Sequence, residues 1–250
     1  MAVQQINILR RIFSFGKSKI LAAVLIALIL VTSLFTLAFA SGGAFDYALF
    51  SGSSTGILSI NGGPTAQVVN GSMHANNRVV LNGGGSIGAI DSVAASVYDA
   101  SKWTIGAVTT GSIATLPDYT QQIIANATVY TGNKTFTGAV DVTTPIYVIG
   151  NVTLNGCTFT GNSQILATGS IYLINSNTGG NICLYSLSTS TTGAIVYQGS
   201  NKTVDATLYA PYGKITLNGS NLTLNGAAIG YNVSLNGTGY IVNKVTYQGF

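Results

Sequence analysis

A short unit recurs along this chain: an alternating apolar strand that ends in Asn-Gly. The copies end at Asn61-Gly62, Asn82-Gly83, Asn155-Gly156, Asn218-Gly219, Asn225-Gly226 and Asn236-Gly237. Asn-Gly readily adopts the positive φ angles of a tight turn. Asn61 and Asn82 are 21 residues apart, and Asn218 and Asn236 are 18 apart. This period, with no helix between the copies, predicts an all-β solenoid, a parallel β-helix of right-handed sense.

An antiparallel sandwich is the alternative, because Asn-Gly is also the preferred turn of a β-hairpin. The segments between turns, such as residues 220–224, are short for hairpin arms. The solenoid is therefore the favoured interpretation.

The composition excludes several classes of protein. Only 6% of the 250 residues are charged, and all six acidic residues are Asp, whereas ordinary domains have about 25% charged residues. After residue 40 six basic residues balance the six acids. A nucleic-acid-binding surface needs clustered Lys and Arg, so we expect no nucleic-acid partner.

An uncharged apolar run covers residues 20–40 and is long enough to span a bilayer as a helix. Basic residues flank this run closely only on its N-terminal side. Because positively charged flanks stay in the cytoplasm, residues 1–19 are expected to be cytoplasmic. Ala38-Phe39-Ala40 also fits a signal-peptidase site. The run is thus either a retained transmembrane anchor or a cleaved signal peptide, and both predict an exported body that is membrane-anchored or secreted.

The exported part divides by repeat and composition. Residues 41–56 are Gly- and Ser-rich and are expected to be a linker or cap. Residues 57–250 are expected to form the β-helix, with a non-repeat insertion at about 98–145. Within the insertion, Pro117-Asp118 opens the one predicted soluble helix, over residues 118–128.

Export raises two questions of covalent chemistry. Nine sequons are candidate N-glycosylation acceptors: Asn70, Asn126, Asn133, Asn151, Asn201, Asn218, Asn221, Asn232 and Asn236. The only two cysteines, Cys157 and Cys183, are either a disulfide across adjacent turns or two buried thiols. Two cysteines and one histidine are too few for a structural zinc site, and we expect no metal or cofactor.

Catalysis is the weakest functional expectation. Glycoside hydrolysis needs two positioned carboxylates, and the candidates Asp91, Asp141 and Asp205 are far apart in sequence. The single histidine, His74, stands in no recognisable catalytic motif and is interpreted as a surface or stacking residue. We therefore expect no enzyme, and a β-helical polysaccharide lyase or hydrolase is kept as an alternative.

Aromatic side chains suggest a different site. Thirteen Tyr and one Trp could line a sugar-binding face, because such rings give amphipathic contact area. The named candidates for this face are Trp103, Tyr119, Tyr197 and Tyr212. The alternative is that these rings fill the core.

The stretches 47–52, 58–62, 69–76 and 208–219 together resemble a known group. It is the β-helical domain of exported, membrane-tethered proteins of the pilus-assembly type, the PilX/TadG-like group. The resemblance covers most of residues 45–240, and its most distinctive piece is the corner Leu208-Tyr209-Ala210-Pro211-Tyr212-Gly213. It implies an envelope or appendage-associated structural role with no catalytic residues to carry over.

These observations predict a non-enzymatic structural protein of the cell surface, associated with the envelope or a pilus. Its expected partners are the membrane, through residues 20–40, and like chains or other envelope subunits. The alternative is a carbohydrate-binding or adhesive module that uses the aromatic face to bind glycans.

Overall fold

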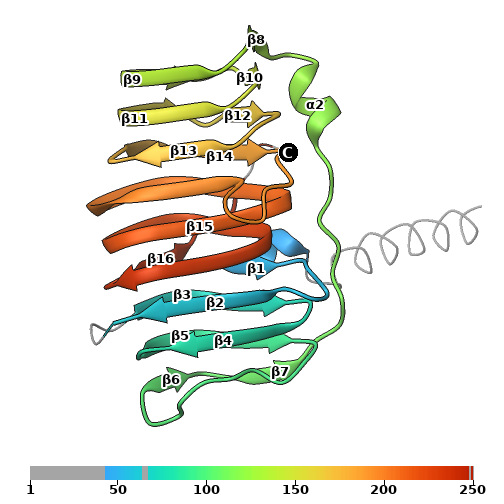
Figure 1. Ribbon diagram of the computed structural model, residues 1–250, viewed down its shortest axis with the longest axis vertical. Coiled ribbons are helices and arrows are strands. Elements are labelled where there is room, and N and C mark those ends of the chain that lie inside the picture. The colour runs from blue at the N-terminus through green and yellow to red at the C-terminus, as the bar shows by residue number, and fades with distance from the viewer. Residues whose placement is uncertain (1–42, 64–66, 248, 250) are drawn as a thin grey trace, which may run out of the picture. The chain divides into compact units, whose positions relative to one another are not determined.

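The computed structural model describes residues 43–63, 67–247 and 249 of the chain. In this part the chain forms one sheet of 16 strands that winds as a parallel β-helix (Figure 1). All registered strand pairs are parallel, so the solenoid prediction is confirmed and the antiparallel sandwich is wrong. The described helical segments are η1 (Ala44–Asp46) and α2 (Thr120–Ile124).

The strands pair in three series, which give the solenoid three faces. The strap face contains β1 (Leu49–Ser51), β7 (Val108–Thr110), β8 (Thr128–Thr131), β10 (Ile146–Ile149) and β12 (Gln164–Ala167). The ladder face contains β2 (Ile57–Gly62), β4 (Arg78–Asn82) and β13 (Ile171–Ile174). The third face contains β6 (Trp103–Ile105) and β16 (Ile241–Lys244).

Longer strands turn corners and contribute to two or three faces. They are β3 (Gln67–Ala75), β5 (Gly85–Ser92), β9 (Lys134–Val142), β11 (Val152–Gly161), β14 (Asn177–Ser186) and β15 (Ile195–Thr238). The register of β3 with β5 shifts between Val69 and Ser72, where the pair passes from the third face to the strap face. One hydrogen-bonded turn is therefore continuous with the next around each corner.

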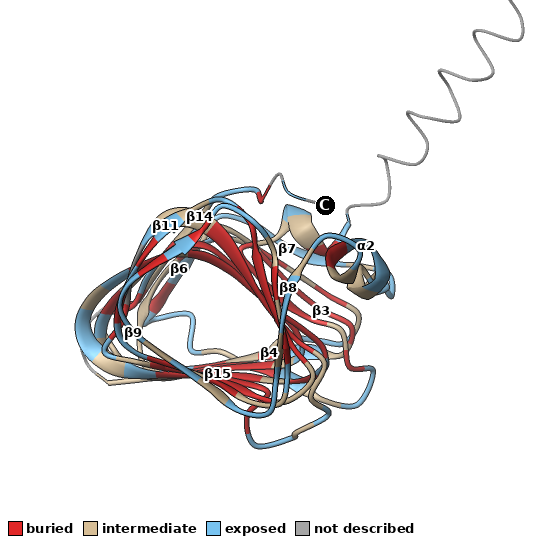
Figure 2. Ribbon diagram, turned by 90° about the horizontal axis from the view of Figure 1, so that it is seen from above, coloured by how far each residue is buried: buried red, intermediate tan, exposed pale blue. Residues whose placement is uncertain are grey.

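Side chains alternate along each strand as the sequence predicts. In β13, Ile171 and Leu173 are fully buried, whereas Tyr172 between them is 36% exposed. Buried residues line the inside of the solenoid, and α2 lies against its outside (Figure 2). The inner core is thus a stack of mainly aliphatic layers that also contains buried aromatic rings such as Phe159 and Tyr197.

One corner is closed by stacked glycines. Gly219 has φ +143° and Gly237 has φ +149°, in the region that disfavours L side chains. A Cβ on Gly219 would overlap the carbonyl oxygen of Gly199, and a Cβ on Gly237 would overlap that of Gly219. Successive turns therefore approach here at a distance that only glycine permits.

The turns do not stack in sequence order. Leu49 of β1 pairs with Met73 on one side and with Ala228 of β15 on the other. The chain enters in the middle of the stack, runs to one end at β6 and β7, and crosses to the other end through residues 111–127 (Figure 1). From β8 it winds back until β15 meets β2 and β16 meets β3.

Two boundary predictions need correction. Residues 98–145 are not one insertion, because β6, β7, β8 and β9 are turns of the solenoid. Only residues 111–127, named the strap here, lie outside the turns, and the predicted helix is confined to α2 within them. Residues 41–56 are not a cap on the end of the stack, because β1 has neighbours on both sides.

The predicted cytoplasmic lead, 1–19, and the apolar segment, 20–40, lie outside the described residues. In the part of the chain that is described, no helix is long and apolar enough to cross a membrane.

Candidate ligand-binding face

The ladder face is bare of covering segments along most of its length, and its outer edge is a hydrogen-bonded row of asparagines. Asn82 Nδ2 donates to Asn61 Oδ1 at 2.9 Å, and Asn61 Nδ2 donates to Asn236 Oδ1 at 2.9 Å. Asn236 Nδ2 donates in turn to Asn218 Oδ1 at 3.1 Å. All three bonds point the same way, so the Asn residues of these four Asn-Gly units join one turn to the next.

A second asparagine row runs along the third face. Asn70 donates to Asn243 at 2.7 Å, and Asn243 donates to Asn225 at 2.7 Å. Asn225 then donates to the Asp205 carboxylate at 2.6 Å. Asp205, which the sequence offered as a catalytic candidate, thus accepts the last bond of a structural row.

A column of outward side chains runs beside the first asparagine row. Backbone registers align Thr135, Thr153, Tyr172 and Val196 in neighbouring turns, and Ser234 with Ser59 and Val80. Neighbouring turns are about 4.8 Å apart, and alternate residues of a strand are about 6.7 Å apart. Within the described chain no Asp lies on this face, and hydroxyl side chains occupy most positions of this column, with Val196 and Val80 as apolar interruptions.

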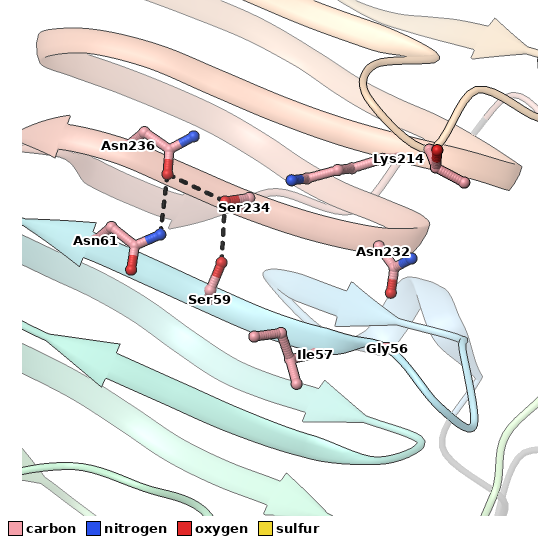
Figure 3. Close-up of a pocket in the computed structure, with 9 residues that line it drawn as sticks. Gly56, Ile57, Ser59, Asn61, Lys214, Asn232, Ser234 and Asn236 are labelled. Carbon is pink, nitrogen blue, oxygen red and sulfur yellow. Dashed lines mark hydrogen bonds between the residues drawn. The ribbon is translucent and has the colours of Figure 1, made fainter.

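A hollow of about 380 Å³ interrupts the ladder face near its middle. Its lining residues are Gly56, Ile57, Ser59, Asn61, Thr191, Lys214, Asn232, Ser234 and Asn236 (Figure 3). Ser59 and Ser234 form the floor and are only 7% and 4% exposed. Lys214 extends across the hollow with its amine toward Ser234 and Asn236 (Figure 3).

The strap face cannot serve as an open site, because the strap covers it. Its outward residues Phe50, Leu166, Tyr185, Tyr209 and Ile229 are all fully buried. They form a second apolar cluster, separate from the inner core, against which Leu116, Tyr119 and Ile123 of the strap pack. This face is a docking surface for the chain's own strap.

Hydrogen bonds to Asp118, near the middle of the strap, help to hold it in place. Asp118 accepts hydrogen bonds from the Thr120 amide at 2.8 Å and from the hydroxyls of Tyr185 and Tyr212, both at 2.9 Å. The bonds from Thr120 are the main reason why the pKa of Asp118 falls to about 2. Asp118 is therefore a structural anion that the strap and the strap face share.

His74 lies on the strap face, where it pairs with Phe50 of β1, and is 1% exposed. Its Nδ1 lies 2.9 Å from Asp91 Oδ2, and its ring stacks on Phe50 at 4.9 Å. Asp91 also accepts bonds from the hydroxyls of Tyr47 and Thr109. Burial acts to raise the pKa of Asp91, but the bonds from His74, Thr109 and Tyr47 outweigh it and lower the pKa.

The three carboxylates offered for catalysis do not form a pair. Asp91 lies on the strap face, whereas Asp141 and Asp205 lie on the third face. The registers place Asp141 and Asp205 in one column three turns apart, which is about 14 Å at 4.8 Å per turn. Paired glycosidase carboxylates are about 5–9.5 Å apart, so the arrangement gives the enzyme alternative no support.

The predicted aromatic ligand face is wrong. Trp103 and Tyr197 are core residues, 5% and 1% exposed, because they occupy inward positions of their strands. Tyr119 is half-buried in the strap, and Tyr212 is 45% exposed but donates to Asp118. The four rings therefore lie in three different environments.

Cys157 and Cys183 are free buried thiols and do not form a disulfide, which was one of the two predicted alternatives. Cys157 belongs to the inner core, and Cys183 belongs to the cluster under the strap. Burial raises the pKa of both thiols. Both side chains therefore act as small apolar groups.

Most sequon asparagines have a structural role that the sequence analysis did not assign. Side-chain hydrogen bonds between turns involve Asn70, Asn133, Asn151, Asn201, Asn218, Asn221 and Asn236. Asn232 lies over Gly56, where a Cβ would overlap its Oδ1. Asn126, just after α2, is exposed, and glycosylation of the nine stays a prediction.

The hollow itself was not found from sequence. The Asn-Gly repeat is the signal for the asparagine row, but Lys214 and Thr191 carry no motif. They meet because loop 187–193 bends over the edge of the ladder face beside β15. Only the arrangement of the turns brings Ser59 to Ser234, 175 residues away.

The fold and the side-chain array define a parallel β-helix protein whose ladder face carries rows of uncharged polar side chains. No family model and no curated protein matches the chain. Among solved structures it is similar to the crystal structure of an ice-binding protein from an Antarctic ascomycete, Antarctomyces psychrotrophicus. That match has 15% identity and a TM-score of 0.34, and it covers 84% of this chain and 98% of the other. A likeness at this level adds nothing to the argument from the site.

Proposed function

We propose that this chain is a non-enzymatic structural protein of the cell surface whose ladder face adheres to an extended, hydroxyl-rich polymer such as a surface glycan. The observation that carries the proposal is the array of hydroxyl and amide groups on that face. The hydroxyl column is interrupted by Val196 and Val80, but hydroxyl or amide groups occur in most turns, and the described residues place no acid among them.

Such an array suits a polymer better than a small molecule. Each exposed hydroxyl or amide contributes little alone, because it exchanges a bond to water for a bond to ligand. A polymer engages many groups at once, and the later contacts form at high effective concentration. The asparagine rows and the packed glycine corner hold the array rigid, which lowers the entropy lost on binding.

The remaining parts of the assignment rest on the sequence. Export and a membrane tether follow from residues 1–40, and association with a pilus or envelope layer follows from the PilX/TadG-like resemblance. Immunogold labelling of native cells with antibody against residues 57–250 tests them. Label along filaments or in a surface layer supports a structural subunit, and label absent from the cell surface contradicts export.

The adhesive role is tested by co-sedimentation of the full chain, in mild detergent, with insoluble cellulose, chitin and peptidoglycan. Thr135→Glu combined with Thr153→Glu puts two charges on the ladder face. The matched control is Thr104→Glu with Thr160→Glu, on the third face. We expect the first variant to lose binding and the control to keep it.

Equal binding by both variants would overturn the assignment of the ladder face. Failure of the unchanged protein to bind any polymer would overturn the adhesive role. The same preparations are tested on growing ice crystals, since the similar crystal structure is that of an ice-binding protein. Binding to ice without binding to polymers would also contradict the proposal.

A further inference from the structure

We propose that the hollow around Lys214 is a binding site for an anionic group, a carboxylate or a phosphate, carried on a hydroxylated polymer. The inference deepens the proposed function, because it rests on the ladder face being the adhesive surface. It adds the chemical class of the ligand and the residues that select it.

Lys214 brings a cation into a hollow that contains no carboxylate. Of the described chain's ion pairs, one joins His74 to Asp91 and the other joins Lys102 to Asp99, so neither uses Lys214. A lysine amine that bends over a polar hollow, with no carboxylate partner among the described residues, can meet an external anion.

The backbone fixes where the Lys214 side chain begins. Its N–H donates to the Ser190 carbonyl at 2.9 Å, and its carbonyl accepts from Ala194 N–H at 2.7 Å. A Cβ on the preceding Gly213 would overlap the Ser188 carbonyl, so the chain is tightly packed here. The side chain is therefore held at the rim and directed across the hollow.

The hydrogen bonds of the floor run in one direction, from Ser59 to Ser234 and on to Asn236. Ser59 Oγ donates to Ser234 Oγ at 2.9 Å, and Ser234 Oγ donates to Asn236 Oδ1 at 3.2 Å. The hydroxyl hydrogens of the floor are thus used within the protein, which leaves oxygen lone pairs toward the hollow. Lone pairs accept from sugar or polyol hydroxyls, whereas the anion itself needs the Lys214 amine.

The rim opposite the floor is also built before binding. In loop 187–193, Ser188 N–H donates to Ser186 Oγ, Ser190 N–H donates to Ser188 Oγ, and Gly193 N–H donates to Ser190 Oγ. These side-chain bonds hold the loop that places Thr191 at the hollow. A preformed rim reduces the ordering cost of binding.

Lysine also indicates the kind of anion. Its ammonium acts as a point charge with three donors, without the planar fork with which arginine selects bidentate partners. The Lys214 ammonium can therefore donate to either a uronate carboxylate or a polyol phosphate. The ligand class is an acidic polysaccharide or a phosphate-bearing polyol chain, and neutral glycans should bind more weakly.

The test measures binding of the full chain in mild detergent to three soluble probes: oligogalacturonate, poly(glycerol phosphate) and neutral dextran. Lys214→Met removes the charge and keeps the apolar stem. The matched control is Lys202→Met, which makes the same charge change elsewhere on β15. We expect Lys214→Met to weaken binding of at least one anionic probe about tenfold or more and to flatten its salt dependence, because one charge contact is lost.

We expect Lys202→Met to change binding by less than about twofold, since Lys202 does not line the hollow and a single surface charge contributes little. Preference for one anionic probe identifies the carboxylate or the phosphate as the ligand group. Equal affinity for dextran and both anionic probes, or equal effects of the two lysine variants, would overturn the site. If the ladder-face glutamate variant loses binding while Lys214→Met keeps it, the proposed function stands and this site falls.

Discussion

Asn76 hydrogen-bonds the strap to the β-helix, so substitution of its side chain should weaken strap docking. The side chain is 4% exposed. Its Nδ2 donates to the carbonyls of Gly52 and Ala114, at 2.8 and 2.7 Å. Its Oδ1 accepts from Ala114 N–H at 2.8 Å and faces His74 Nε2 at 3.0 Å. The amide thus imitates a strand partner for Ala114, bonding both its N–H and its carbonyl.

Asn76→Ala removes four hydrogen bonds, of which the two to Ala114 join the strap to the β-helix. The bonds to Gly52 and His74 lie within the β-helix and do not depend on whether the strap is docked. At a net contribution of about 1 kcal/mol for each strap bond, we expect strap docking to weaken by about 2 kcal/mol. At 1.4 kcal/mol per factor of ten, the opened strap becomes about 30-fold more populated.

Amide hydrogen exchange of the full chain measures this opening directly. The reporter is the Ile123 amide, which donates to the Tyr119 carbonyl in α2 and makes no bond to Asn76. We expect it to exchange about 30-fold faster in Asn76→Ala, with Ile165 in the buried β12 unchanged. Asn77→Ala, which removes a single exposed bond to Thr55, is the matched control. Unchanged exchange at Ile123 would refute the role of Asn76 in holding the strap against the β-helix.

Three further predictions test other parts of the fold. Gly219→Ala places a side chain at a positive φ and against the Gly199 carbonyl, whereas Gly138→Ala places one at φ +71° in open space. We expect the free energy of unfolding, measured by chemical denaturation, to fall by about 3 kcal/mol for Gly219→Ala and by about 1 kcal/mol for Gly138→Ala. Equal losses would contradict the close approach of the turns. The pKa of Asp118 is lowered to about 2, so its contribution is complete above about pH 4, where the unfolded carboxyl ionises, and is lost as pH falls through about 2. The near-UV circular dichroism of the tyrosines under the strap should show that transition in the native chain and lose it in Asp118→Asn. Asn61→Ala breaks two exposed 2.9 Å bonds of the asparagine row and should lower the free energy of unfolding by about 1 kcal/mol; no change in thermal unfolding would show that the row is not stabilising.

The turn-by-turn structure was predictable because its causes are local. Alternation of apolar and polar residues sets which side chains face inward, as Ile171 and Leu173 show on either side of Tyr172. Asn-Gly marks the corners, and the 21-residue step from Asn61 to Asn82 is one turn of the solenoid. The same alternation could have corrected the aromatic prediction, since Tyr197 shares the parity of the inward Ile195.

The order of the turns was not predictable, because the repeat that specifies a turn does not specify its neighbour. Asn61 bonds Asn82 on one side and Asn236 on the other with the same 2.9 Å geometry. Any strand–Asn–Gly unit fits any other in this way, so the local code is degenerate. The hollow around Lys214 depends on that order, and the sequence alone therefore could not reveal it.

The junction between β15 and β2 shows how the fold resolves this degeneracy. Closing a loop of about 175 residues costs about 5 kcal/mol of chain entropy, from (3/2)RT ln n. Both asparagine rows cross the junction, through Asn61 with Asn236 and Asn70 with Asn243, and Ser59 bonds Ser234 beside them. Three side-chain bonds of about 1 kcal/mol each, added to the parallel strand pairs there, offset much of that cost. In an ordinary solenoid each turn depends only on its sequence neighbours; here the most distant parts of the chain must pair before the stack is continuous. The ladder face, which spans that junction, therefore exists as one surface only when the whole solenoid has folded.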